Sequence, residues 1–285
     1  KPDLDVFTDI NVRDEYFQDV LKRQAVVNPN LLFVYRFQKE DGSFEEKEFI
    51  YENGITDYVN EIAAGENLTS VQNWSADRVG RDREDKSEYK VKMEFALTFS
   101  NKIKKIEYYH NSSFLEHGGS PERAVKQAFV SQIDAYLKQN NKYLKNEKKI
   151  TFDDVEDCLI LVSSSFSTQT SYENQTKKAI TNKFIYETMT EFLKHQLEIY
   201  FIENPDEALK IAEQVMVNKR SRENAEKTRL NLKKKLAGTI DLSNMVKKFV
   251  DCRTKDVSRR ELYIVEGDSA LGAVNLAREA EFQAV

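Results

Sequence analysis

The stretch that decides the fold of the last part of this chain is Glu261–Ala270, which reads Glu-Leu-Tyr-Ile-Val-Glu-Gly-Asp-Ser-Ala. Its apolar run, Leu262–Val265, consists of strand-forming residue types, and a helix-compatible segment, Asn275–Glu279, follows. This pattern predicts a buried strand of the parallel type. Such a strand delivers Glu266 and Asp268 to its carboxyl end, where open α/β sheets place their chemistry. Two carboxylates there could bind a divalent metal or exchange protons with a substrate oxygen.

The same stretch allows two other interpretations. An acidic turn could merely cap the next helix, with Asp268 or Ser269 as the N-cap residue, and on chemistry alone this is the favoured interpretation. A nucleophile elbow, Gly-x-Ser-x-Gly, fits only in its first half, because Leu271 stands where the second glycine belongs. No Asp or His follows Ser269 in this sequence, so we reject a serine hydrolase.

Residues Glu261–Ala270 resemble the first strand of the TOPRIM domain in type IIA DNA topoisomerases, specifically in the B subunits of bacterial gyrase and topoisomerase IV. The family pattern is Glu-Leu-Tyr-(Leu/Ile)-Val-Glu-Gly-Asp-Ser-Ala-Gly-Gly. This chain matches ten positions before Leu271 replaces the first of the closing glycines. The resemblance implies a catalytic role for Glu266, which in the family takes part in general acid–base chemistry and binds Mg²⁺ together with a later Asp-x-Asp pair.

Composition bounds the class of protein and its partners. Hydrophobic residues make up 40% of the sequence, charged residues 32%, and the net charge is −5, so any contact with DNA must come from a local basic patch. Cys158 and Cys252 lie far apart, which argues against a disulfide framework or a zinc site and favours a reducing compartment. We find no apolar run of membrane-spanning length and no signal-peptide pattern at Lys1, and therefore expect a soluble, cytoplasmic protein.

The first third of the chain predicts an α/β segment. Apolar residues at helical spacing predict helices over Arg13–Gln24 and Gly54–Ala64. The strand-like runs Leu31–Phe37 and Glu46–Tyr51 flank a hairpin signal, Asp41-Gly42. The order of these elements resembles the end of the family's GHKL-type ATPase domain, to which we assign residues 1–66. The resemblance puts that domain's metal-binding asparagine and glycine-rich lid upstream.

The next part predicts a loop and then a hairpin. Polar residues crowd around a lone Trp74 in Glu66–Ser87, which predicts a long loop anchored by that tryptophan. Apolar and polar residues then alternate over Tyr89–Phe99, the clearest strand pattern in the chain. With Ile103–His110 it predicts one antiparallel hairpin with one buried face. His110 in that pattern is expected to be a core or edge histidine rather than a ligand.

Residues His117–Pro121 break the chain before a helix, with Ser120 as the expected N-cap and Pro121 as the first helical residue. The two glycines before Ser120 could bind an anion, but a plain tight turn is the favoured interpretation. After a Lys/Asn-rich loop, Cys158–Phe166 predicts a further strand. This order of elements resembles the family's transducer domain, a ribosomal-protein-like α+β unit whose βαβ fold has a left-handed crossover, and we assign residues 67–236 to it.

The polar loop Ser167–Asn174 runs into Gln175-Thr176-Lys177, which alone is a weak signal because solvated loops often carry a lysine. By resemblance it is the family's Gln-Thr-Lys switch loop. In that loop Lys177 binds the γ-phosphate of ATP held by the ATPase domain, and Gln175 adds orienting hydrogen bonds. Loss of the γ-phosphate releases the loop, so the resemblance implies a nucleotide sensor.

Two helices are expected next. The first covers Lys178–Phe201, and the second begins with Asn204 as N-cap, Pro205 as first residue and Glu207 at the capping-box position. The second helix is amphipathic at first, with Leu209 and Ala212 in its apolar stripe, and polar all round over Asn218–Arg229. Such a helix is docked at one end and free at the other.

The polar half of this helix carries cations that are either an ordinary solvated face or the basic side of a lever over a DNA channel. In the second case Lys233, Lys234 and Lys235 would face phosphates. The cations are Lys219, Arg220, Arg222, Lys227, Arg229, Lys233, Lys234 and Lys235. Residues 237–259 are assigned to a connector, in which Asp251-Cys252 resembles the family's Asp-Cys, and residues 260–285 to the start of TOPRIM.

The sequence thus predicts an α+β protein with a transducer domain, a long helix and the opening of a TOPRIM α/β domain. The resemblance implies part of an ATP-dependent type II topoisomerase B subunit, with ATP and Mg²⁺ as cofactors. It also implies double-stranded DNA and an A subunit carrying the cleavage tyrosine as partners, and a homodimer of B subunits. We expect this segment alone to be inactive. The alternative is a non-catalytic transducer or interaction module of a mismatch-repair ATPase of the MutL type or another GHKL nucleotide switch. Gyrase, topoisomerase IV and a phage or plasmid relative are not separated.

Overall fold

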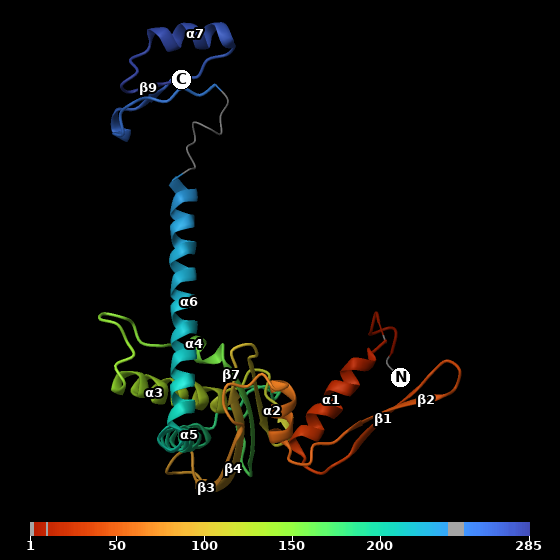
Figure 1. The fold of residues 1–285 in the computed structure, drawn as a ribbon. Helices are drawn as coiled ribbons and strands as arrows, with labels where there is room; N and C mark the ends of the chain where they lie inside the picture. Colours follow the sequence, from red (N-terminus) through yellow and green to blue (C-terminus); the bar gives the residue numbers. More distant parts are fainter. Residues whose placement is uncertain (1–2, 10, 239–247) are drawn as a thin grey trace. The chain divides into compact units, whose positions relative to one another are not determined.

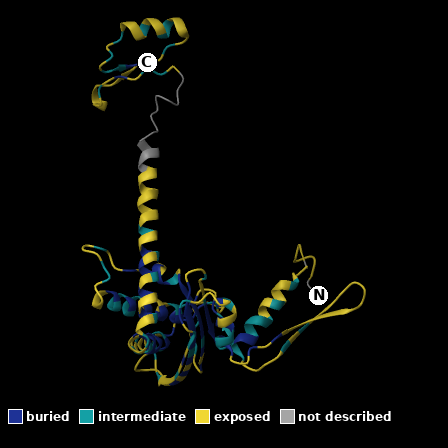
Figure 2. Ribbon diagram, in the orientation of Figure 1, coloured by how far each residue is buried: buried dark blue, intermediate teal, exposed yellow. Residues whose placement is uncertain are grey.

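The computed structural model describes residues 3–9, 11–238 and 248–285, with side chains in the long helix described up to residue 233. The chain divides into two compact units, Lys1–Arg222 and Glu223–Val285, and each is described here by itself. Figure 1 shows the ribbon, and Figure 2 shows that buried residues gather in and around the central sheet of the first unit.

The amino-terminal elements confirm the predicted helix–hairpin–helix order. They are α1 (Asp14–Val27), β1 (Phe33–Gln38), β2 (Phe44–Phe49) and α2 (Ile55–Ala63). Strands β1 and β2 pair antiparallel, and Gly42 at φ +82° makes the turn between them, as the Asp-Gly signal predicts. Helix α2 buries its apolar face, including Ile55 and Val59, against one side of the central sheet.

The central sheet has five strands in the order β3-β4-β7-β5-β6. Its strands are β3 (Gln72–Gly80), β4 (Tyr89–Phe99), β5 (Lys105–His110), β6 (Ser113–Phe114) and β7 (Leu159–Ser167). Neighbours pair antiparallel except β5 and β7, which run parallel. The connection from β5 to β7 passes through α3 (Ser120–Gln139) and α4 (Phe152–Glu156). A βαβ unit is therefore present, as predicted, while the hand of its crossover stays a prediction.

Two sequence predictions for this sheet are wrong. The expected loop 66–87 contains strand β3, which pairs with β4 from Gln72 opposite Leu97 to Gly80 opposite Tyr89. Strand β3 lies at an edge with mostly exposed side chains, so it lacks clear alternation, and Trp74 is its one fully buried anchor. The expected hairpin of β4 and β5 does not form, because β7 lies between these strands. The almost wholly buried run of β7 takes the centre of the sheet.

Helix α3 begins one residue away from the predicted position. Ser120 is the first helical residue, and the N-cap is Gly119 at φ +86°. Instead of capping the helix, the Ser120 hydroxyl donates to the Asn182 carbonyl oxygen at 2.8 Å. A Cβ on Gly119 would lie 2.2 Å from the carbonyl oxygen of Ile180, so this glycine allows two backbone segments to touch.

Helices α5 (Lys183–Glu203) and α6 (Pro205–Gly238) follow. Helix α5 packs beside α3 on the face of the sheet opposite α2, where the largest core cluster lies. Pro205 opens α6 as predicted, but the capping box does not form: Glu207 accepts hydrogen bonds from Ser70, and the Asn204 N–H donates to Tyr200 O. Leu209, expected in the apolar stripe, is 36% exposed, and Ile211 is buried instead.

The second unit contains η2 (Val257–Arg259), β8 (Glu261–Leu262), α7 (Asp268–Ala277) and β9 (Gln283–Ala284). The predicted buried strand is reduced to two residues, which pair in parallel with β9. Ile264 is 90% exposed, and among the described residues of this unit β9 is the one strand that pairs with β8. Helix α7 starts at Asp268 with Gly267 as N-cap, so neither Asp268 nor Ser269 takes that place. In the described ranges no helix is long and apolar enough to cross a membrane.

Candidate functional site

The predicted switch loop joins the end of β7 to the start of α5. Its outgoing strand (residues 168–173) and its returning strand (residues 178–182) are hydrogen-bonded to each other, and we call them the stem of the loop. The Glu173 N–H donates to Ala179 O at 3.0 Å, and the Thr181 N–H donates to Ser171 O at 2.8 Å. The returning strand also pairs with the turn before α3, where the His117 N–H donates to Lys178 O at 2.9 Å. These bonds explain why α5 begins at Lys183 rather than at Lys178. The backbone groups of residues 178–181 form hydrogen bonds to other segments and so do not join the helix.

The tip of the loop is a turn over Asn174–Lys177 that holds both predicted nucleotide-binding residues. Thr176 N donates to Asn174 Oδ1 at 3.1 Å, and Lys177 N donates to Asn174 O at 3.2 Å. Gln175 and Lys177 are exposed, and Lys177 has a left-handed backbone with φ +58°. These two hydrogen bonds lie within the turn itself.

The ammonium of Lys177 is available to an anionic ligand. It lies 5.6 Å from the centroid of the Tyr172 ring, a cation–π distance, and no carboxylate among the described residues pairs with it. The neighbouring Lys178 differs, because its ammonium forms an ion pair with Glu116. Of these two adjacent lysines, Lys178 is paired with Glu116, whereas Lys177 has no carboxylate partner among the described residues.

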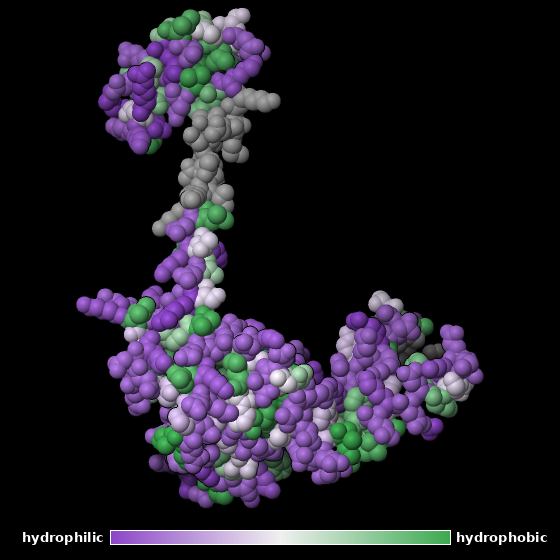
Figure 3. All heavy atoms as spheres, in the orientation of Figure 1, coloured by the Kyte–Doolittle hydropathy of each residue, from purple (hydrophilic) through white to green (hydrophobic). Residues whose placement is uncertain are grey.

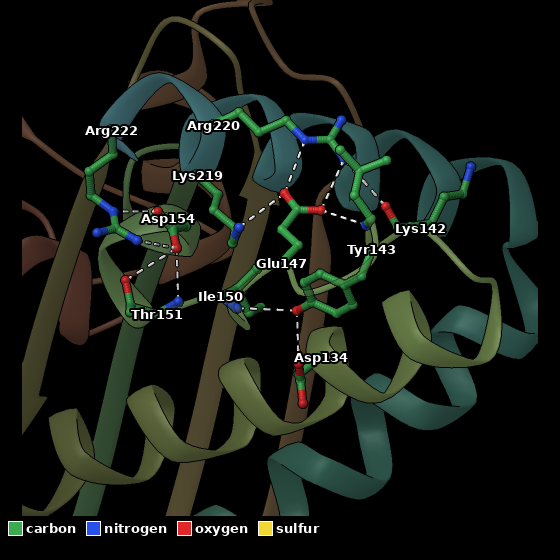
Figure 4. Close-up of polar contacts among 11 residues, drawn as sticks. Asp134, Lys142, Tyr143, Glu147, Ile150, Thr151, Asp154, Lys219, Arg220 and Arg222 are labelled. Carbon is green, nitrogen blue, oxygen red and sulfur yellow. Dashed lines mark hydrogen bonds and ion pairs between the residues drawn. The ribbon is translucent and has the colours of Figure 1, made fainter. Parts of the chain in front are cut away.

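A second polar cluster lies where α6 leaves the core, and Figure 4 shows it. The Lys219 side chain is fully buried, and its Nζ donates to Glu147 Oε1 at 3.0 Å. Arg220 also donates to Glu147, from Nε to Oε1 at 3.2 Å. Arg222 grips Asp154 with two bonds, Nε to Oδ1 at 2.7 Å and Nη2 to Oδ2 at 3.0 Å. We call Glu147, Asp154, Lys219, Arg220 and Arg222 the lever-root cluster.

The lever-root cluster stabilises the charged form of Glu147. The Arg220 guanidinium lowers the pKa of Glu147 to about 2, aided by the Leu144 N–H and the Lys219 ammonium. Asp154 also accepts the Thr151 N–H at 2.8 Å, so one carboxylate caps α4 and binds α6. Two acids from the segment between α3 and β7 thereby fix α6 to the body of the first unit.

This cluster corrects part of the expectation for the basic helix. Lys219, Arg220 and Arg222 were grouped with cations of a DNA-facing lever, but they pair with acids of the body. Arg229 pairs with Glu226 on the helix surface, and Lys233 is exposed. The side chains of Lys234 and Lys235 lie outside the described residues. In the space-filling view the exposed part of α6 is mainly hydrophilic (Figure 3). Two leucines of this helix, Leu230 and Leu232, are also exposed.

Glu266 follows the apolar run Leu262–Val265 and is exposed, as is Asp268. Asp268 forms an ion pair with Lys248. Among the described residues no group of three or more His, Cys, Asp or Glu side chains is placed to hold a metal ion. The structure therefore presents Glu266 as a single available carboxylate beside Gly267, whose φ of +85° makes the turn into α7.

Comparison with known proteins settles the family. The family model described as DNA gyrase B matches residues 54–231, which is more than half of the chain. The chain belongs to the DNA gyrase B family. The gyrase B subunits of Chlamydia pneumoniae and Spiroplasma citri are each 30% identical to it over its whole length. The chain covers 34% and 43% of these two relatives, so it spans less than half of either.

A solved structure supports the fold of this gyrase B family member. The 43K ATPase domain of Thermus thermophilus gyrase B, determined with an aminocoumarin, superposes with a TM-score of 0.57 at 20% identity. The match covers 80% of this chain and 59% of that domain. The mixed α+β architecture is therefore that of gyrase B ATPase-region structures.

Sequence reasoning missed the acids of the lever-root cluster. Glu147 sits in a Lys/Asn-rich loop, 72 residues from Lys219, and no local pattern marks it. Asp154 was readable as a capping-box residue, because Thr151 stands three positions before it. Its second role as the Arg222 partner depends on the tertiary fold.

Proposed function

We propose that this chain is the coupling segment of an ATP-dependent type II DNA topoisomerase B subunit. It would report the state of bound ATP to the part of the enzyme that cuts and passes DNA. The observation that carries this proposal is the ammonium of Lys177, which no described carboxylate pairs with, at the tip of a loop whose two ends are hydrogen-bonded to each other. The proposed organisation assigns residues 1–66 to the ATPase domain, 67–236 to the transducer, 237–259 to a connector and 260–285 to the start of TOPRIM.

The residues at the loop tip fit a nucleotide triphosphate. Lys177 supplies a compact ammonium group with three donors on a long side chain, and Gln175 supplies a neutral amide at the same exposed turn. ATP would supply the γ-phosphate, whose charge these donors balance. Lys177 would hold that charge while ATP is intact and lose its ligand after hydrolysis. The Asn174–Lys177 turn would then be free to move.

The lever-root cluster gives the proposal its second part. A signal from the loop would reach α5 through the hydrogen-bonded base of the loop, and α6 through the core cluster that holds side chains of both helices. Helix α6 is clamped to the same body by Glu147 and Asp154. Displacement of that body therefore carries the root of α6 with it. We propose that this is how the nucleotide state is transmitted along the lever.

Glu266 fits part of a Mg²⁺ site. A carboxylate oxygen is a ligand that Mg²⁺ prefers, and the exposure of Glu266 leaves room for further ligands. Mg²⁺ would stabilise charge on the oxygens of a DNA phosphate, and the Asp-x-Asp pair implied by the resemblance would complete its shell. Glu266 would itself hold or release a proton at the leaving oxygen. Double-stranded DNA, an A subunit with the cleavage tyrosine and a second B subunit are the proposed partners.

The test uses the full-length B subunit assembled with its A subunit. Lys177→Ala removes a charge-assisted contact of about 1.5–3 kcal/mol, so ATP turnover should fall by about tenfold or more. Lys178→Ala is the matched control, since its ammonium already has a partner in Glu116. Wild-type turnover in Lys177→Ala would remove the proposed role of the loop. The loop would then be an ordinary surface turn, and the proposed coupling role of this gyrase B family member would lose its mechanism.

A further inference from the structure

His110, at the end of β5, is fully buried and bonds to the start of the switch loop. Its Nδ1 lies 2.8 Å from the Ser165 hydroxyl. Its Nε2 lies 3.0 Å from the hydroxyls of Ser167 and Thr170. Thr170 is three residues beyond the end of β7 and belongs to the outgoing strand of the loop. A core histidine thus contacts the element that carries Lys177.

The directions in which these hydroxyl groups donate determine which imidazole nitrogen of His110 donates a hydrogen bond and which accepts one. Ser165 Oγ donates to Tyr109 O at 3.1 Å, so it accepts from Nδ1. Ser167 Oγ donates to Gln169 O at 2.7 Å, so its hydrogen is used as well. Nε2 must then accept, and Thr170 Oγ1 is the donor. Burial lowers the pKa of His110 to about 4, which keeps the ring neutral and able to accept.

Asn111 holds the same strand from a second side. Its Oδ1 accepts the Ser167 N–H at 3.0 Å, and its Nδ2 donates to Ser167 O at 3.2 Å and to Thr170 Oγ1 at 3.1 Å. The backbone of Asn111 is left-handed, with φ +47°, a conformation that asparagine tolerates better than most residues. This turn aims the amide at the end of β7 and fixes the outgoing strand as it leaves the sheet.

The side chain of Asn182 fixes the returning strand of the loop in a comparable way. Its Oδ1 accepts the Ser171 N–H at 2.7 Å, and its Nδ2 donates to Asp82 Oδ2 at 2.9 Å and to Tyr89 OH at 3.1 Å. Asp82 in turn accepts the Phe184 N–H at 2.8 Å, at the start of α5. Both strands of the loop are anchored by buried side chains, and the tip between them has local contacts.

We propose that His110 and Asn111 are positioning residues that hold Thr170, and with it the outgoing strand of the switch loop, so that Lys177 meets its anionic ligand at a fixed place. The inference rests on the proposed function of Lys177 as the γ-phosphate ligand. A lysine on an exposed turn has a long flexible stem, and its productive position is specified only if the turn itself is held. The anchors supply that constraint from the core.

The test is a double-mutant cycle on steady-state ATP hydrolysis by the full-length B subunit with its A subunit. Asn111→Gly keeps the left-handed backbone and removes the amide, and Thr170→Val removes the hydroxyl at constant shape. Each should lower kcat/KM for ATP by about threefold to tenfold, the loss expected for one or two neutral hydrogen bonds. In a Lys177→Ala background the same changes should cost nothing further, since the group they position is gone.

Two controls separate positioning from stability. Asn141, like Asn111, has a left-handed backbone, but it is exposed, and Asn141→Gly should leave kcat/KM at the wild-type value. His110→Leu should act like Thr170→Val, whereas His110→Gln, which returns an acceptor toward Thr170, should recover most of the loss. If His110→Leu does not fold, Asn111→Gly and Thr170→Val decide alone.

The possible failures are distinct. If Lys177→Ala is impaired but the Asn111→Gly and Thr170→Val losses multiply with it, the anchors act elsewhere and this inference is overturned alone. If Asn111→Gly loses no more than Asn141→Gly, the inference is likewise overturned. If Lys177→Ala itself hydrolyses ATP at the wild-type rate, the proposed function and this inference fall together.

Discussion

The ammonium of Lys219, on α6, lies fully buried 3.0 Å from the Oε1 atom of Glu147, in the loop that precedes α4. The Glu147 side chain is only 9% exposed, so both charges have left water. A buried charge is costly unless it is paired, and here the Lys219 ammonium and the Glu147 carboxylate pair, with Arg220 also donating to Glu147. The contact fixes the point at which the long helix leaves the core, and the first two predictions concern it.

Glu147→Gln should destabilise the chain by about 3 kcal/mol, because it removes the carboxylate charge that the buried Lys219 ammonium and the Arg220 guanidinium share. Urea unfolding of the 285-residue chain measures this. Glu226→Gln is the control, since the Glu226–Arg229 pair on the same helix is exposed and should change stability by less than about 1 kcal/mol. If both changes lower the free energy of unfolding equally, the buried pair stabilises the fold no more than the exposed one.

The free energy of unfolding should change with pH as Glu147 becomes protonated. Its folded-state pKa is lowered from 4.5 to about 2, so its contribution is complete above the ordinary value and is lost as pH falls toward the folded value. The difference in unfolding free energy between wild type and Glu147→Gln should therefore shrink across this window. A constant difference from neutral pH down to the acid end would contradict the assignment.

DNA binding by the far end of α6 can be measured through salt dependence. If Lys233, Lys234 and Lys235 meet phosphates, changing all three to Gln in the assembled enzyme should flatten the slope of log affinity against log salt by roughly two to three units. The same loss of charge at Lys145, Lys148 and Lys149, on the exposed loop before α4, is the matched control. An unchanged slope in the helix variant would leave those lysines as a solvated face.

Glu266→Gln in the full-length enzyme with its A subunit should abolish DNA cleavage and leave ATP hydrolysis at the wild-type rate, because the carboxylate acts on the DNA phosphate and not on the nucleotide. Glu279→Gln, at an exposed position just after α7, should cleave normally. Cleavage assays with supercoiled plasmid and an ATPase assay on the same preparation give both readouts. Normal cleavage by Glu266→Gln would end the proposed role of this residue.

Local patterns in the sequence predicted the local elements well. The alternation over Tyr89–Phe99 is strand β4 residue for residue, and Pro205 does open α6. Periodicity failed where a segment depends on distant partners. Strand β3 is held at its edge by β4 and by Trp74 against Tyr200, whose ring centroids lie 6.0 Å apart, so its polar outer face concealed it. The place of β7 between β4 and β5 is likewise a long-range choice.

The candidate site shows the same division. Gln175 and Lys177 were found from a motif, and the structure places them together at one exposed turn. The roles of His110 and Glu147 were out of reach, because a buried imidazole and a loop carboxylate acquire their partners only through tertiary contacts. The apolar run Leu262–Val265 was expected to be buried. In the described part of Glu223–Val285 most of this run is exposed, and a single two-residue strand, β9, pairs with β8 there.

The most direct test of the account is to ask which lysine the γ-phosphate reaches. An ATP analogue with an acyl group on its γ-phosphate transfers that group to a neighbouring lysine Nζ, forming an amide and releasing ATP. Incubated with the full-length B subunit and analysed by peptide mass spectrometry, it should label Lys177, with excess ATP suppressing the label, and should leave Lys178 unmodified. Labelling confined to other lysines, with Lys177 untouched, would contradict the claim that this loop senses the nucleotide.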